Sequence, residues 1–166
     1  MRILGIDPGL AIVGFGVVDY RASHFTTLAH GAILTPAKTE IVSRLELIER
    51  QMNELLDKFK PEQMAIEELF FNSNHTTAIP VAEARGVILL TAYKHGVEIF
   101  EYMPLQVKQA VVGYGRAEKK QVIEMTTRIL NLTAAPKLDD TADALAIAVC
   151  HAHTGGSAIR GFYNLS

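Results

Sequence analysis

The fold is decided at the start of the chain, where residues 1–9 read MRILGIDPG. The apolar run is short and a Pro-Gly turn stops it, so we predict a buried strand over residues 1–6. Asp7 follows directly, at the carboxyl end of this strand. Open α/β sheets bind ligands at the carboxyl ends of their strands, so this stretch predicts an α/β fold with a site at Asp7.

The rest of the chain supplies four more strand patterns and five helical ones. Residues 12–20 and 25–34 are rich in Val, Ile, Phe and Thr and form an antiparallel meander with the first strand. Together the patterns predict a five-stranded mixed sheet, three antiparallel strands followed by two parallel ones, with helices on both faces. The remaining strands are predicted over residues 64–69 and 97–102, and the helices over residues 41–59, 77–95, 105–112, 117–130 and 140–153.

Composition and charge limit the class of protein. The chain has 166 residues, 49% of them hydrophobic, which predicts one globular domain over residues 1–153 and a flexible C-terminal tail over residues 154–166. Cys150 is the single cysteine, so no intrachain disulfide can form, and no stretch resembles a signal peptide or a membrane span. We therefore expect a soluble cytoplasmic protein without a membrane partner.

A second acid ends the fourth predicted strand. Side chains alternate along a strand, so Gly5 shares a face with Asp7, and Ala65 shares a face with Glu67. If these strands are parallel neighbours, the two carboxylates lie side by side, and the tiny residue before each leaves room beside it. Glu68 points with the bulky apolar set, so Glu67 is the preferred candidate.

The third group of acids opens the last predicted helix. Asp140 and Asp143 are three residues apart and share a helix face, while Asp139 is best explained as the N-cap. Each acid alone has an ordinary structural explanation. An acid inside an apolar strand is nevertheless unfavourable to bury without a partner, and Mg²⁺ is such a partner for clustered carboxylates. Two ions about 4 Å apart can activate a water for phosphoryl chemistry.

The net charge of −2 argues against a nucleic-acid partner, but the charge is unevenly distributed. Residues 104–137 hold six basic side chains against two acidic ones. A solvated helix face would explain this excess as well, so it permits a phosphate-binding surface without establishing one. The basic residues are Lys108, Arg116, Lys119, Lys120, Arg128 and Lys137.

Four sequence motifs in one order resemble a known family. They are GIDPG at residues 5–9, AIE at 65–67, QVKQAVVG at 106–113 and DTADALA at 140–146. The chain resembles the RuvC Holliday-junction resolvases, which have the ribonuclease H-like fold, from Met1 to about His153. The resemblance implies a homodimer that makes paired symmetric nicks in four-way junction DNA, using one or two Mg²⁺ ions per subunit or Mn²⁺ in their place. It also implies branch-migration proteins as partners in recombination and repair.

The resemblance assigns roles residue by residue. It implies Asp7, Glu67, Asp140 and Asp143 as metal ligands, and Lys119 as an assisting group at the cleaved phosphate. Lys108, Lys119, Arg116 and Lys120 are expected to contact DNA, in agreement with the basic segment. Phe70 follows Glu67 as the family's junction-probing aromatic ring; a core or dimer-interface phenylalanine is an equally good explanation.

Some residues depart from the pattern. Pro80, in the first turn of its predicted helix, stands where we expect a polar or basic residue, and the nearby Glu83 is acidic, so DNA contacts along this helix are not expected to follow the family closely. Arg85 is interpreted as a compensating contact or a surface arginine.

His151 shares the face of the acids but lies two turns further on, and a structural role is favoured. Exposed apolar residues on the helix over residues 77–95, namely Ile79, Val87 and Leu90, suit a dimer interface.

Three other functions remain as alternatives. The GIDPG opening also resembles RuvC-like nucleases that trim ribosomal RNA precursors. It is also similar to the strand end of actin-like ATPases, although no second phosphate loop follows. A non-catalytic junction-binding scaffold is the third, and it is disfavoured because four carboxylates without metal would repel phosphate.

Overall fold

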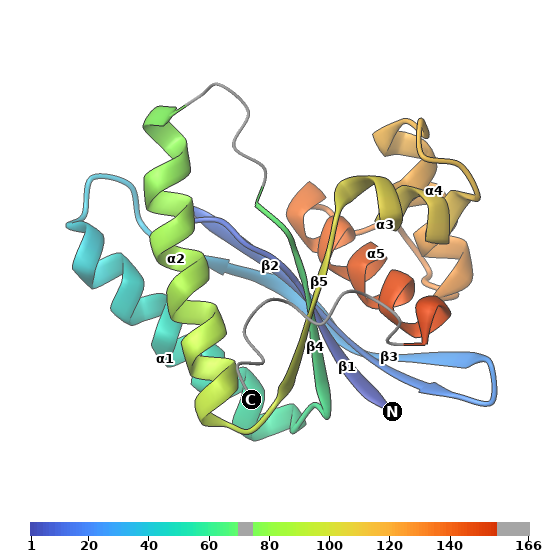
Figure 1. Cartoon of the computed structure of the whole chain (residues 1–166), viewed down its shortest axis with the longest axis horizontal. Helices are drawn as coiled ribbons and strands as arrows, with labels where there is room; N and C mark the ends of the chain where they lie inside the picture. Colours follow the sequence, from blue (N-terminus) through green and yellow to red (C-terminus); the bar gives the residue numbers. More distant parts are fainter. Residues whose placement is uncertain (70–74, 156–166) are drawn as a thin grey trace, which may run out of the picture.

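The structure, a computed structural model, describes residues 1–69 and 75–155, and within them five strands form one sheet in the order β3-β2-β1-β4-β5 (Figure 1). The first three strands pair antiparallel, and β4 and β5 continue parallel to β1. This arrangement confirms the predicted mixed sheet. The strands are β1 (Arg2–Asp7), β2 (Ile12–Arg21), β3 (His24–Leu34), β4 (Gln63–Glu67) and β5 (Glu98–Tyr102).

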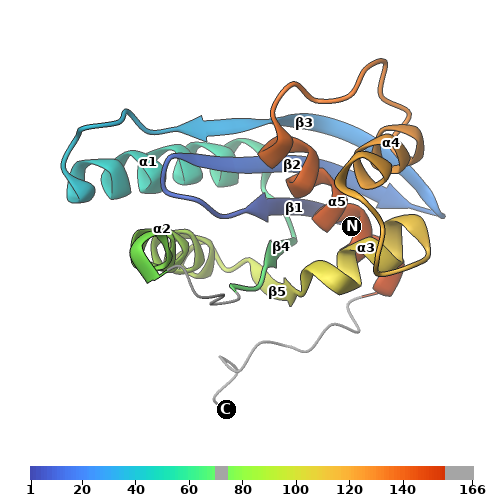
Figure 2. The ribbon, with the colours of Figure 1, turned by 90° about the horizontal axis from the view of Figure 1, so that it is seen from above.

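Helices cover both faces of the sheet, as predicted (Figures 1 and 2). One layer contains α1 and α2, and the other contains α3, α4 and α5. Every element lies within one or two residues of its predicted bounds. The helices are α1 (Ile41–Phe59), α2 (His75–Lys94), α3 (Pro104–Val112), α4 (Lys119–Ile129) and α5 (Asp139–Thr154).

Each layer has its own apolar core. Ile48, Met52 and Leu56 of α1 are fully buried or nearly so, against the sheet face that carries Leu4 and Ile6. On the opposite face α5 is the central helix. Its residues from 144 to 152 are all buried, so it is enclosed by the sheet and by α3 and α4.

Two helix details differ from expectation. Pro61 was expected to close the first helix, but Lys60 ends α1 in a left-handed conformation, with φ of 46° and its N–H donating to the carbonyl of Leu56, so Pro61 follows the cap. The helix α2 begins at His75, and Pro80 therefore lies in its second turn, not its first. A proline there removes one backbone hydrogen bond near the start of the helix.

No helix in residues 1–69 and 75–155 is both long and apolar enough to cross a membrane. Thr154, where the flexible tail was predicted to begin, is the last residue of α5, and Gly155 caps the helix with φ of 59°. Residues 156–166 of the predicted tail lie outside the described part of the chain.

Candidate active site

The first two acids end neighbouring parallel strands, as predicted. Gly5 pairs with Ala65 and Ile6 with Ile66, so Asp7 and Glu67 come next on strands about 4.8 Å apart. Glu67 also pairs with Tyr102 across the β4–β5 ladder. Both acids are half-buried. Two carboxylates are thus held side by side at one edge of the sheet.

The third acidic segment is brought to this edge by glycines. Gly14 of β2 lies directly opposite Asp7, and a Cβ added to Gly14 would overlap the carbonyl oxygen of Asp140. A Cβ at Gly5 would likewise overlap the carbonyl oxygen of Ala144. The backbone of α5 therefore rests directly on β1 and β2. The space that the small residue at Gly5 was expected to leave beside Asp7 is filled by α5, so that expectation is wrong.

The start of α5 is fixed by a hydrogen bond to the third strand. The Thr141 hydroxyl donates to the carbonyl oxygen of Gly31 at 3.0 Å. The N-cap is Leu138, which makes no side-chain capping bond, so the predicted N-cap role of Asp139 is wrong. Asp139 is instead the first residue of the helix, and its carboxylate contacts Lys119 from α4.

Lys119 is the cation nearest to the acids in the described part of the chain. Its Nζ lies 2.9 Å from Oδ2 of Asp143 and 3.3 Å from Oδ2 of Asp139. Partial burial lowers the pKa of Lys119, but the hydrogen bonds and charges of these two aspartates raise it overall. The ammonium group therefore stays charged and partly balances the acidic edge.

The electrostatics show that the acids act on one another. Burial, followed by the charges of Glu67, Asp143 and Asp140, raises the pKa of Asp7 to about 8. Burial and then Asp143 raise the pKa of Glu67, against the opposing effect of Lys119 and Lys108. Burial also raises the pKa of Asp143, although Lys119 lowers it. Without a cation these carboxylates cannot all be ionised at neutral pH without a large electrostatic penalty.

The side chains do not yet converge on a point. Within residues 1–69 and 75–155, no three His, Cys, Asp or Glu side chains are grouped closely enough to hold a metal ion as they stand. Carboxylates without a counterion repel one another, and the raised pKa values of Asp7, Glu67 and Asp143 show this repulsion together with burial. The donor set itself, hard oxygens at a half-buried edge, has the chemistry that Mg²⁺ prefers.

The predicted DNA-contacting residues fall in different places. Lys108 of α3 is half-buried and acts electrostatically on Glu67, so it belongs to the acidic edge. Arg116 precedes α4 and Lys120 lies in its first turn, and both are exposed. Phe70 lies outside the described residues.

Two expectations on α2 are wrong and one on α5 is confirmed. Arg85 is buried and pairs with Glu101 of β5 at 2.5 Å, so it is not a surface arginine. Val87 packs partly against the core, whereas Glu83 is exposed. His151 is fully buried and hydrogen-bonded inside the protein, which confirms its structural role.

The sequence did not point to the glycines as part of the site. Gly14 and Gly16 alternate on one face of β2, and both meet α5. Glycine weakens a strand interior, so two on the same face are a signal of close backbone approach. No sequence pattern predicted the contact between Lys119 and Asp139, because the two residues lie on different helices that a loop separates.

Comparison with known proteins gives consistent matches along the chain. A family model described as "Crossover junction endodeoxyribonuclease RuvC" matches residues 3–151. A protein of that description from Alkaliphilus metalliredigens is 58% identical over 155 residues, covering 93% of this chain and 94% of the relative. Another, from Alkaliphilus oremlandii, is 56% identical with the same coverage.

Solved structures of Holliday junction resolvases also match this chain. The Thermus thermophilus RuvC structure in complex with a Holliday junction substrate matches with a TM-score of 0.89 and 38% identity, over 93% of this chain and 94% of that one. A yeast mitochondrial Holliday junction resolvase matches with a TM-score of 0.69 at 14% identity, over 92% of this chain and 78% of that one, which shows a shared fold alone. These matches confirm the predicted ribonuclease H-like fold.

Proposed function

The chain belongs to the RuvC family of crossover junction endodeoxyribonucleases, and from this premise we propose that it resolves four-way DNA junctions by paired, symmetric, metal-dependent nicks. The observation that carries the proposal is the meeting of acids from three distant segments at one sheet edge, where burial and the neighbouring carboxylates raise the pKa of Asp7 to about 8. The alternatives of RNA processing and of a non-catalytic scaffold are not favoured, because both the sequence relatives and the substrate complex are junction resolvases.

Asp7, Glu67, Asp140 and Asp143 are the residues that would hold Mg²⁺, with Mn²⁺ as a substitute and one or two ions per subunit. When bound, the metal supplies Lewis acidity that activates water and offsets charge on the scissile phosphate. The backbones of the residues that would hold the ion are fixed by strand pairing and by the glycine contacts of α5. A bound cation would also offset the burial and the carboxylate repulsion that raise the pKa of Asp7.

Lys119 pairs with two aspartates and is also the proposed contact to the cleaved phosphate. In the metal-free protein its ammonium group neutralises Asp143 and Asp139. Lys119, whose side chain is half exposed, would hydrogen-bond the phosphate at the cleavage point once a cation at Asp143 balanced that carboxylate. Lys108 of α3 also acts electrostatically on Glu67, and it would assist in holding the same phosphate.

The basic surface beyond this point consists of Arg116 and Lys120. Both are exposed beside Lys119, so they are placed to neutralise phosphates next to the cleaved one. Such contacts add affinity that falls with salt and carries no sequence information. Phe70 remains the proposed junction-probing ring.

Symmetric nicking needs two active sites, and α2 offers a surface for a two-fold dimer. Ile79, Leu90 and Tyr93 are 66%, 54% and 76% exposed and lie on one helix face with Gly86 between them. A self-complementary apolar stripe of this kind fits an isologous interface. Light scattering at micromolar concentration should give a dimer, and a monomer there would contradict this part of the proposal. A cytoplasmic setting with branch-migration proteins as partners completes the proposal.

The test is cleavage of a labelled synthetic four-way junction in Mg²⁺. Asp7→Asn should bind the junction as the wild type does but cut it at least about 100-fold more slowly, because even outer partners of metal ligands change activity 10–100-fold. Asp57→Asn is the matched control, because Asp57 is an exposed aspartate of α1 in the opposite helix layer, and it should cut normally. Unchanged cutting by Asp7→Asn would refute the assignment.

A further inference from the structure

A buried histidine joins α5 to β4, the strand that carries Glu67, and to its neighbour β5. His151 is fully buried, and its ring contacts Phe100 with centroids 4.6 Å apart. Its Nδ1 lies 2.6 Å from the hydroxyl of Tyr102 on β5, and its Nε2 lies 2.8 Å from Oε1 of Gln63 on β4. One imidazole thus makes a hydrogen bond to each strand.

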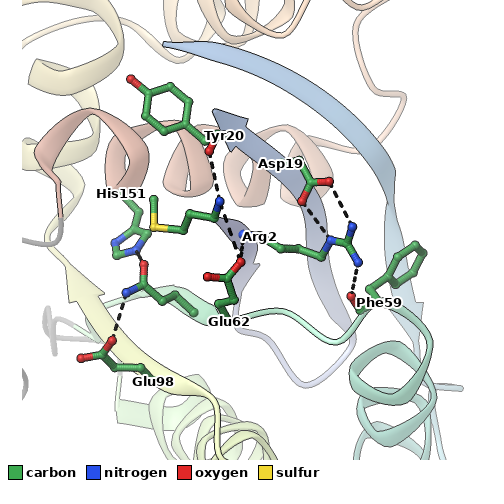
Figure 3. A network of polar contacts seen from close by, with 9 residues as sticks. Arg2, Asp19, Tyr20, Phe59, Glu62, Glu98 and His151 are labelled. Carbon is green, nitrogen blue, oxygen red and sulfur yellow. Dashed lines mark hydrogen bonds and ion pairs between the residues drawn. The ribbon is translucent and has the colours of Figure 1, made fainter. Parts of the chain in front are cut away.

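Which atoms donate in these hydrogen bonds follows from Glu98, at the end of the series. The side-chain amide of Gln63 donates to Oε2 of Glu98 at 3.0 Å, because a carboxylate can only accept (Figure 3). Oε1 of Gln63 must then accept from Nε2–H of His151. The bare Nδ1 accepts in turn from the Tyr102 hydroxyl. The ring is neutral, since burial lowers the pKa of His151 to about 4 against the opposing charge of Glu98.

The three residues are placed around the acidic edge in a specific way. Gln63 lies four residues before Glu67 on the same strand and the same face, and Tyr102 is the pairing partner of Glu67 on β5. His151 lies eight residues after Asp143 on α5, about 12 Å along the helix axis. The hydrogen bonds therefore connect the helix that carries Asp143 to the strand that carries Glu67. His151 lies about two turns of α5 from Asp143, whereas Tyr102 is the cross-strand neighbour of Glu67.

Packing alone does not fix α5 along this direction. The glycine contacts hold its backbone against β1 and β2, but contact with β4 and β5 is made through side chains, and apolar side chains can slide by small amounts at little change in energy. Hydrogen bonds weaken steeply with distance and angle, so two of them on one ring define a single position.

We propose that His151, held by Gln63 and Tyr102, is a positioning residue that sets where α5 lies along β4 and β5, and thereby the gap between Asp143 and Glu67 that a divalent cation must bridge. The inference rests on the proposed function. Loss of either hydrogen bond lets α5 shift, which widens the range of Asp143–Glu67 separations and weakens cation binding without touching any ligand.

The experiment measures Mn²⁺ binding to the full chain without DNA by titration calorimetry, and then single-turnover junction cutting in saturating Mg²⁺. Tyr102→Phe removes the donor to Nδ1 together with the 3.1 Å contact between the Tyr102 hydroxyl and the Thr154 hydroxyl. Gln63→Met removes the acceptor at Nε2 together with the amide donor to Glu98, with little change in volume. Either variant should raise the Mn²⁺ Kd by about 3- to 10-fold, at or below the 10–100-fold range of groups bonded directly to metal ligands. Binding of the junction without metal should not change.

Two controls separate positioning from general stability. Tyr20→Phe makes the same chemical change at a tyrosine whose hydroxyl has no hydrogen bond among the described residues, and it should leave Mn²⁺ affinity unchanged. Ile48→Val weakens the core on the opposite face of the sheet and should lower Tm without changing Mn²⁺ affinity. If Ile48→Val raises the Mn²⁺ Kd as much as Tyr102→Phe does, the positioning role is overturned.

The remaining outcomes are also decisive. Wild-type Mn²⁺ affinity in a folded Tyr102→Phe or Gln63→Met protein overturns the inference, and circular dichroism identifies which variants are folded. Should both fail to fold, the nitrogen NMR shifts of His151 in the wild type decide: a bare Nδ1 and a protonated Nε2 support the inference, and the reverse tautomer overturns it. A wild type that binds Mn²⁺ but cuts no junction contradicts the proposed function alone.

Discussion

On one face of the sheet α1 and α2 pack through long aliphatic side chains, whereas on the other face α5 lies with its backbone against glycines of β1 and β2. The first kind of packing tolerates small shifts, because side chains can change rotamer. The second fixes how closely α5 approaches β1 and β2, because neither backbone can yield, but it does not fix the position of α5 along β4 and β5. The acids Asp140 and Asp143 stand on the helix that is held by backbone contact, so the rigid face of the sheet is the one that carries the chemistry.

Gly14→Ala should have the largest effect on stability and cutting, because it disturbs the backbone contact between β2 and α5. The added methyl would overlap the Asp140 carbonyl, and displacing α5 is expected to lower the free energy of unfolding by about 3 kcal/mol or more and to abolish cutting. Urea unfolding and the junction assay measure the two effects.

Gly16→Ala is the matched control, on the same strand and the same face. Its methyl would meet mainly the side chain of Leu145, which can move, so we expect a loss of about 1–2 kcal/mol with cutting retained. Equal losses for the two variants would show that backbone contact has no special part in holding the site.

Removing the charge of Asp7 tests the comparison of the two sheet faces further. The face that carries α5 holds the Asp7 carboxylate where its ionisation lowers the stability of the metal-free protein. In the folded protein the pKa of Asp7 is about 8, above its ordinary value of 3.8. Between these two values the unfolded chain binds fewer protons, so wild-type stability falls as pH rises from about 4 to about 8 and then levels off. Below about 4 both states are protonated and the effect disappears.

Asp7→Asn removes this dependence. In EDTA at pH 8 the variant should be more stable than the wild type, by at most about 6 kcal/mol, since one pKa unit corresponds to about 1.4 kcal/mol and the shift is about four units, and the difference should shrink toward pH 4. With Mg²⁺ the order should reverse, because only the wild type gains binding energy. Thermal unfolding across this pH range checks both statements, and a variant less stable than the wild type in EDTA would contradict them.

The fold was largely predictable because its signals are local. The apolar run before Asp7 and the one before Glu67 each define a strand, and alternation along the two strands places both acids on one face. The parallel neighbourhood of these strands was the one non-local assumption, and the pairing of Gly5 with Ala65 confirms it.

What the sequence could not give depends on contacts between distant residues. Arg85 looked like a surface arginine because its partner, Glu101, lies on a strand 16 residues further along. Asp139 fits the composition of an N-cap, but the helix begins one residue earlier and its carboxylate is taken by Lys119. The partners of His151 come from β4 and β5, and no spacing in the sequence links them.

The smallest expected effect lies on the tolerant face. Ile48 is fully buried between α1 and the sheet, and Ile48→Val removes one methylene, which should lower the free energy of unfolding by about 1 kcal/mol. The neighbouring side chains of Met52 and Leu56 can adjust, and no part of α5 touches this core. Junction cutting in saturating Mg²⁺ should therefore equal that of the wild type. A clear loss of cutting would mean that packing on the α1 face is transmitted through the sheet to the acids, and the two faces could then no longer be treated as independent.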